Sequence, residues 1–318
     1  MLYNIKKSFA THHIKDGIHN IYFEEYGNPE GIPVLFLHGG PGSGCSDSHK
    51  AIFDNKKLRV VFWDQRGSGK SIPKRETRKN TTQILIKDIE NIRDYLNVKT
   101  WFLVGGSWGA TLAIAYAEKY SNRVKGIVLR SLFLATKKEI EWAFLEAPLY
   151  FRPQLIYDMN MALNLEPYKN PIPILGKYLE SDSINKNCIG AELWLEYESN
   201  LSTLENKKNK INEIINNNDF SKERIKRLPN TPFMEWHFIK NNFFLEDNQL
   251  HINKFNLTDI PIRIVQSNYD LLCPPKTSYM FIKGLKKAKI ININAGHYMS
   301  DPGIKEKLIE IINDITNE

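Results

Sequence analysis

The first third of the chain alternates between short apolar segments and a segment with helical periodicity. Residues 18–27 alternate apolar and polar positions, which is typical of a half-buried strand. Three continuously apolar runs predict strands buried on both faces: 33–40 (PVLFLHGG), 59–64 (RVVFWD) and 101–106 (WFLVGG).

A helix is predicted between the second and third of these runs. Its apolar residues recur at the spacing of one helix face, at Leu85, Ile89, Ile92 and Leu96, and a threonine is available as N-cap. Strands that alternate with helices imply a parallel, doubly wound sheet, so the fold class is α/β.

The same alternation returns near the C-terminus. The patterns there predict strands over 260–268 and 288–294 and helices over 276–285 and 303–315. We therefore expect residues 1–134 and 251–318 to form one α/β core.

Residues 135–250 have a different pattern. Aromatic-rich helical stretches are interrupted by prolines, and no continuously apolar strand segment occurs. We interpret this part as a helical cap domain inserted into the core. The prolines are Pro148, Pro153, Pro167, Pro171 and Pro173.

Ser107 stands between two glycines where a predicted strand meets an alanine-rich helical run, in the segment GGSWG. A strand that turns into a helix within a few residues needs glycine on both sides, because the turn is strained and the two elements approach closely. The serine is then exposed at a helix N-terminus. This is the G-x-S-x-G nucleophile elbow, and it makes Ser107 a candidate nucleophile.

A serine hydroxyl needs a histidine to take its proton and a carboxylate to orient that histidine. Asp270 follows the strand predicted over 260–268, and His297 follows the strand predicted over 288–294, so the chain order is serine, acid, histidine. We predict a catalytic triad of Ser107, Asp270 and His297. The competing acids fit less well, because Asp259 precedes its strand and Asp301 follows the histidine too closely.

Backbone N–H groups must also bind the oxyanion that forms during acyl transfer. The glycine-rich turn HGGPG follows an early predicted strand, and we assign the N–H groups of Gly40 and Trp108 to the oxyanion hole. The turn could instead serve backbone shape alone.

The segment DQRGSGKS nearly matches a phosphate-binding loop. However, the first glycine of that motif would fall at Asp64, and Pro73 follows where a long helix should begin. We therefore expect no nucleotide site.

The net charge of +7 comes from 43 Lys and Arg against 36 Asp and Glu. The basic residues are dispersed among acidic ones, as in 205–227, so nucleic-acid binding is not expected.

The three cysteines, Cys45, Cys188 and Cys273, are far apart and predict neither disulfides nor a metal site. Residues 1–13 lack the apolar core of a signal peptide, and no apolar run of about 18 residues occurs, so we expect a cytoplasmic protein without membrane contact.

Several motifs together resemble the prolyl aminopeptidase (proline iminopeptidase) family of α/β-hydrolases. They are HGGPG, DQRGSGKS, GGSWG, the LRSLF of 129–133, and the segments ending at Asp270 and His297, and the resemblance runs across nearly the whole chain. It implies removal of an N-terminal residue, usually proline, from small peptides with a free N-terminus. It implies no metal and no cofactor, and it leaves the oligomeric state open.

Such an activity requires recognition of a positively charged terminal amine. The segment ELWLEYES resembles the family's W-x-x-W-E motif, with Glu198 in the acidic position and Tyr197 in place of the second tryptophan. The segment MEWHF resembles the family's E-N-H-Y-F, with Glu235 as the matching acid. Two carboxylates suit the two N–H donors of a secondary ammonium. Both glutamates could instead be surface residues of helices.

The resemblance also implies a proline pocket with Phe133 and Cys273 in its wall. Two aromatic positions of the family are not kept, because Ala143 or the shifted Phe144 stands at one and Ile239 at the other. A broader residue preference is therefore an alternative. Two further alternatives are an esterase or amidase whose substrate lacks an amine, and a non-catalytic binding protein on the same fold.

Overall fold

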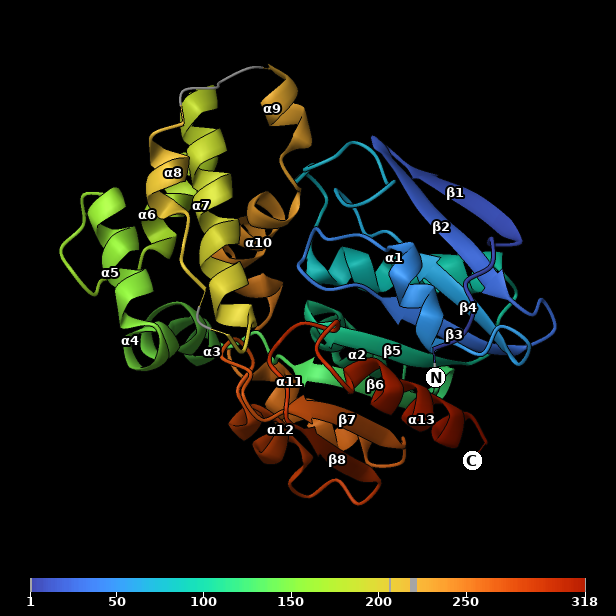
Figure 1. Cartoon of the computed structure of the whole chain (residues 1–318). Helices are drawn as coiled ribbons and strands as arrows, with labels where there is room; N and C mark the ends of the chain where they lie inside the picture. The colour runs from blue at the N-terminus through green and yellow to red at the C-terminus, as the bar shows by residue number, and fades with distance from the viewer. Residues whose placement is uncertain (1, 206, 218–221, 318) are drawn as a thin grey trace.

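An eight-stranded sheet forms the centre of the molecule (Figure 1). The computed structural model describes residues 2–205, 207–217 and 222–317. The spatial order of the strands is β1-β2-β4-β3-β5-β6-β7-β8. Their bounds are β1 Ala10–Asp16, β2 His19–Gly27, β3 Ile32–Leu37, β4 Leu58–Trp63, β5 Trp101–Ser107, β6 Val124–Leu132, β7 Ile262–Ser267 and β8 Ala288–Ile293.

The strands from β4 to β8 pair in parallel, whereas β1 and β2 form an antiparallel edge. The carboxyl ends of the parallel strands therefore lie along one edge of the sheet, which is where ligands bind in open α/β folds. The expected mostly parallel, doubly wound α/β sheet is confirmed.

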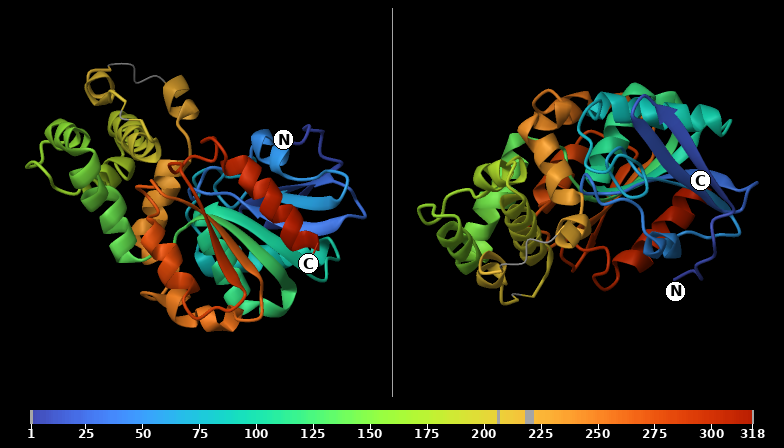
Figure 2. Two further views of the ribbon diagram at one scale, coloured as in Figure 1. Left: turned by 60° about the horizontal axis from the view of Figure 1, so that its bottom comes forward. Right: turned by 90° about the horizontal axis from the view of Figure 1, so that it is seen from above.

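Alternate residues of the central strands face two separate cores. In β3, Leu35 and Leu37 belong to the core beneath α1, α2 and α12, while Val34 and Phe36 belong to the core beneath α13. The continuous apolar runs of the sequence are thus explained by burial on both faces. Figure 2 shows α13 lying across one face of the sheet. These helices are α1 Thr82–Tyr95, α2 Trp108–Lys119, α12 Pro275–Ile282 and α13 Ile304–Asn317.

The first helix forms as the sequence predicts. Thr81 is its N-cap, with the side-chain oxygen accepting a hydrogen bond from Ile84 N at 3.3 Å. Leu85, Ile89 and Ile92 are buried on its inner face.

Between β6 and β7, the described residues of 135–250, which we call the insertion, contain helices and no strand. Figure 1 shows these helices gathered to one side of the sheet. Prolines mark helix starts, since Pro153 opens α5 and Pro171 is the N-cap of α6. The helices are α3 Lys137–Glu141, α4 Ala147–Phe151, α5 Pro153–Ala162, α6 Ile172–Leu179, α7 Ile184–Ser202, α8 Ile211–Ile215, α9 Lys222–Arg227 and α10 Thr231–Lys240, with a π-helical turn at Trp142–Glu146 and α11 Gln249–Ile252 leading back to the sheet.

Two strands, β1 and β6, were not predicted. The DQRGSGKS segment is followed by turns, and the next helix begins only at Thr82, so the geometry of a phosphate-binding loop is absent from this described segment. Within the mixed-charge stretch 205–227, positions 206 and 218–221 lie outside the described residues. None of the helices in the described ranges combines the length and apolarity needed to cross a bilayer.

Candidate active site

Ser107 is the last residue of β5 and directly precedes α2. Its backbone has φ 55° and ψ −125°, a region that non-glycine residues rarely adopt. The flanking glycines are required by close approach: a Cβ at Gly105 would lie 2.4 Å from Gly109 O, and one at Gly109 would lie 2.1 Å from Leu37 O. The strained turn that the sequence predicts is therefore present.

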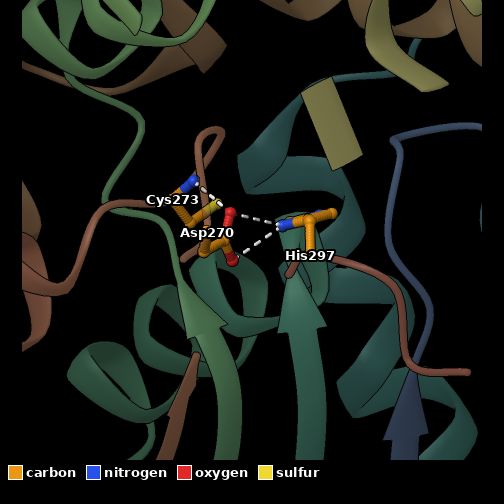
Figure 3. A group of neighbouring side chains, drawn as sticks. All are labelled: Asp270, Cys273 and His297. Atoms are coloured by element: carbon orange, nitrogen blue, oxygen red, sulfur yellow. Dashed lines mark hydrogen bonds and ion pairs between the residues drawn. The ribbon is translucent and has the colours of Figure 1, made fainter. Parts of the chain in front are cut away.

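Asp270 and His297 come from the loops after β7 and β8 and meet above the sheet (Figure 3). His297 Nδ1 lies 3.0 Å from Asp270 Oδ1 and 2.9 Å from Oδ2. The backbone N–H groups of Leu272 and Cys273 donate to Oδ1 at 3.0 and 2.8 Å. Burial alone would raise the pKa of Asp270, but His297, Cys273 N–H and the Ser131 hydroxyl hold that pKa below its usual value. The aspartate is thus fixed as an anion beside the imidazole.

The loop that carries His297 is anchored at its backbone on both sides. His297 N donates to Ser202 O at 2.9 Å, at the end of α7. Arg130 Nη1 donates to the carbonyl oxygen of His297, and also to Ser131 Oγ at 3.0 Å. The insertion and β6 therefore both anchor the loop that carries the imidazole.

Ser107 and His297 line one cavity of about 430 Å³. Within the described residues, the Ser107 hydroxyl interacts with the thiol of Cys273 and forms no hydrogen bond with His297. The three residues of the predicted triad share one site, but serine and histidine are not hydrogen-bonded in this structure.

A second, smaller cavity of about 50 Å³ adjoins the first. The two cavities share Gly40, Ser107, Glu198 and Glu235. Apolar side chains form most of the remaining wall of the small cavity, namely Pro41, Phe133, Ile140, Ala143, Phe144, Ile239, Phe243, Leu272 and Cys273. The structure thus brings together every residue that the sequence proposed for the pocket.

Glu198 on α7 and Glu235 on α10 form a hydrogen-bonded carboxyl pair at the junction of the cavities. Burial raises the pKa of Glu235 well above its usual value, and the neighbouring Glu198 raises it further. Burial also raises the pKa of Glu198, although the charge of His297 opposes this rise. Trp194 Nε1 donates to Glu235 Oε2 at 2.5 Å. The raised pKa values therefore favour retention of a proton by the pair, and a cation bound between the two carboxyl groups would oppose that retention.

We expect Glu235→Gln to stabilise the ligand-free protein at neutral pH. Because the pKa of Glu235 is raised in the folded state, folding stability is lost as pH rises through the folded pKa. Glutamine keeps an acceptor for Trp194 and a donor for Glu198, and it carries no titrating proton. Melting temperatures measured from pH 4 to pH 8 should fall less with rising pH in the variant than in the wild type. The exposed control Glu166→Gln should follow the wild type, and parallel curves for all three proteins would contradict this electrostatic account.

Asp270, Cys273 and His297 also have the composition of a metal site, with ligand atoms within 4.8 Å of one another. Burial, followed by the charge of Asp270, raises the pKa of Cys273 well above its usual value, which favours the neutral thiol. Asp270 Oδ1 already accepts two backbone N–H bonds. The arrangement is that of an oriented Asp–His pair.

The glycine-rich turn after β3 lies directly against the serine turn. A Cβ at Gly39 would lie 3.2 Å from Gly106 O, and Gly40 lines both cavities. Trp108 N belongs to the first turn of α2, whose N–H groups have no acceptor within the helix.

Three residues that support the site were not singled out from the sequence. Ser131 and Arg130 hold Asp270 and the His297 loop, and the buried Gln65 bridges the glycine-rich turn and Trp108. Arg130 and Ser131 lie in the LRSLF segment and Gln65 in the DQRG segment. Both segments were noted as motifs, but the roles of these residues become visible only from their contacts in the structure.

Comparison with known proteins places this geometry in a family. The model of the alpha/beta hydrolase fold matches residues 32–303. A probable proline iminopeptidase of Leptolyngbya boryana is 36% identical over 296 residues, covering 92% of this chain and 89% of the relative. The proline iminopeptidase of Neisseria meningitidis serogroup A is 33% identical over 317 residues, covering 99% of this chain and 98% of the relative. The chain belongs to the proline iminopeptidase family of α/β-hydrolases.

Solved structures agree at the level of the fold. A proline iminopeptidase-related protein from Thermus thermophilus superimposes with a TM-score of 0.60 at 21% identity, covering 97% of each chain. An alpha/beta fold family hydrolase from Bacillus anthracis gives 0.63 at 20% identity, covering 97% of this chain and 100% of the other. The family resemblance stated from the motifs is confirmed by the relatives along nearly the full length.

Proposed function

We propose that this protein is a serine aminopeptidase that releases the N-terminal residue, preferentially proline, from small peptides with a free N-terminus. One observation carries the proposal: a buried carboxyl pair lies beside Ser107 at the mouth of a small apolar cavity. A cationic amine and an apolar ring at the first residue match these two features.

In the first step the terminal ammonium docks between Glu198 and Glu235. A unit charge about 4 Å from a carboxylate gains roughly 4 kcal/mol at an effective dielectric constant near 20. The positive charge of the bound ammonium stabilises both carboxylates and lowers their pKa values, so the shared proton is released. The scissile carbonyl then reaches the position between Ser107 and the N–H groups of Gly40 and Trp108.

Acyl transfer follows from the residues around that carbonyl. Ser107 rotates about its Cα–Cβ bond from Cys273 toward His297, and His297 Nε2 accepts the hydroxyl proton as Oγ attacks the carbonyl carbon. The N–H groups of Gly40 and Trp108 bind the oxyanion. Asp270 stabilises the imidazolium, because its anionic form is already held beside Nδ1.

Breakdown of the tetrahedral intermediate uses the same groups. His297 returns the proton to the leaving amine, and the shortened peptide departs. Water then attacks the acyl-enzyme with His297 as base, which restores Ser107 and frees the amino acid. The residues that carry this scheme need no cofactor.

Residue preference is set by the small cavity. Phe133 and Cys273 form part of its wall, and Ala143 and Ile239 stand where the family motifs carry aromatic side chains. A compact five-membered ring suits a small cavity whose wall is mostly apolar. The strictness for proline stays a prediction.

We further propose that the insertion acts as the cap of the active site, since α7 and α10 supply the two glutamates. A cap of this kind limits the peptide length that can enter. The cytoplasmic location stays a prediction.

A pair of matched substrates tests this function. We expect proline anilide to be hydrolysed and N-acetylproline anilide, which lacks the cationic amine, to be turned over at least about 100-fold more slowly, because the docking energy is lost. A fluorophosphonate should label Ser107 and stop both reactions. Equal rates on the two anilides would point to an esterase or amidase, and failure to label would point to a non-catalytic binding protein.

A further inference from the structure

We propose that Gln65 is a positioning residue that holds the two oxyanion donors, Gly40 N–H and Trp108 N–H, in a fixed mutual geometry. The inference rests on the proposed function. It assigns a role to a buried side chain of the DQRG segment that touches neither cavity and that the catalytic scheme does not use.

The side chain of Gln65 connects the two segments that carry these donors. Its Nε2 donates to His38 O at 3.0 Å, in the turn that continues to Gly40. Its Oε1 accepts from Trp108 Nε1 at 2.8 Å. Gln65 is 1% exposed, so water cannot replace either bond. The carboxamide of Gln65 thus links Trp108, the residue after Ser107, to the glycine-rich turn that follows β3.

His38 adds a second link from the same residue. Gln65 N donates to His38 Nε2 at 3.1 Å, and a backbone N–H can only donate. The proton of the imidazole therefore lies on Nδ1, which donates to Gly39 O at 2.9 Å. The 3.3 Å approach of Gly44 N to Nδ1 is then a contact between two donors, not a hydrogen bond. Burial lowers the pKa of His38, which keeps this neutral tautomer.

The glycine-rich turn after β3 contains few side chains that could fix its backbone, so we expect its geometry to depend on the hydrogen bonds from Gln65. Gly40 and Gly42 have φ of 98° and 107°, and glycine provides no side chain to fix these angles by packing. Trp108 has its indole packed against Phe238 and Phe243, with ring centroids 4.7 and 5.7 Å away. Gln65 therefore joins the packed indole to a turn whose glycines have no side chains to fix their backbone angles. An oxyanion donor acts only when it points at the developing charge.

The decisive variant is Gln65→Leu, which removes both side-chain bonds at similar volume. We expect kcat for proline anilide to fall about 10-fold to 100-fold with little change in KM, because loss of a whole oxyanion donor costs roughly 10²–10³ in kcat. Pyrrolidine-2-boronic acid, which forms a tetrahedral adduct on serine, should bind more weakly by a similar factor. Pyrrolidine, which lacks the carboxyl group and so uses only the amine site and the small cavity, should bind the variant and the wild type equally.

Trp108→Phe gives an independent test should Gln65→Leu not fold. It removes the Nε1 donor and leaves the backbone N–H in place, so kcat should fall in the same way. If both variants fold, their double variant should lose less than the product of the single losses, because both break one linkage. Additive losses would overturn the linkage.

Asn160→Leu is the matched control for loss of a buried carboxamide. Asn160 is fully buried and bonds Lys169 N and O at 2.9 and 2.8 Å, outside both cavities. It should lower the melting temperature without changing kcat. Unchanged kcat and boronate affinity in Gln65→Leu would overturn the inference, as would an equal loss of pyrrolidine binding. Absence of boronate binding in the wild type would instead refute the proposed function.

Discussion

Replacing Ser107 by alanine is expected to lower kcat on proline anilide by about 10⁴-fold or more, because the nucleophile is lost while the amine site and the oxyanion donors remain. Binding of free proline should persist, since neither glutamate is touched. Steady-state kinetics and calorimetric titration with proline measure the two effects. Retained turnover in the folded variant would refute the role of Ser107.

Ser107→Gly is the informative partner of that variant. The φ of 55° at this position costs a non-glycine residue about 1–3 kcal/mol, and alanine keeps this strain. Glycine relieves it, at the expense of roughly 0.5–1 kcal/mol of unfolded-state entropy. Both variants should be inactive, and the glycine variant should melt at the higher temperature. An order of melting temperatures with alanine above glycine would show that the strain at the turn is negligible.

Replacing Glu198 or Glu235 by glutamine is expected to lower kcat/KM for proline anilide by about 100-fold, because each substitution removes a negative charge that faces the ammonium. Hydrolysis of a neutral aryl ester should change little, since its attack uses only Ser107, His297 and the oxyanion donors. Equal losses on anilide and ester would remove both glutamates from amine recognition.

Glu196→Gln provides the matched control. Glu196 lies on the same helix α7 but lines neither cavity, and its carboxylate accepts from Asn200 and from Lys210 N. Its substitution should leave the ratio of anilide hydrolysis to ester hydrolysis as it is in the wild type. A change as large as that of Glu198→Gln would mean that the ratio reports the stability of α7 and not contact with the amine.

The buried strands were predictable because a strand buried on both faces consists of a continuous run of apolar residues. Edge strand β1 carries no such run, since its side chains alternate between partly buried and exposed and include two histidines and a lysine. β6 did contain a readable signal in 126–129, but its polar end, Arg130 and Ser131, obscured the strand. The helical insertion was recognisable from its prolines, whereas the packing of its helices depends on contacts between distant residues.

The candidate site was predictable where a residue type is tied to a place after a strand, as for Asp270 and His297. The two glutamates came from family resemblance, because nothing in the local pattern of α7 or α10 distinguishes a buried acid from a surface one. Gln65 was beyond sequence reasoning for a physical reason. Its importance lies in two partners, 27 and 43 positions away, that no periodicity brings together.

The bond from His297 N to Ser202 O joins the imidazole loop to the helix that also carries Glu198. Helix α7 therefore contacts the site twice, through the side chain of Glu198 and through the backbone of the His297 loop. A displacement of α7 would therefore change the position of the Glu198 carboxyl group and of the His297 loop at the same time.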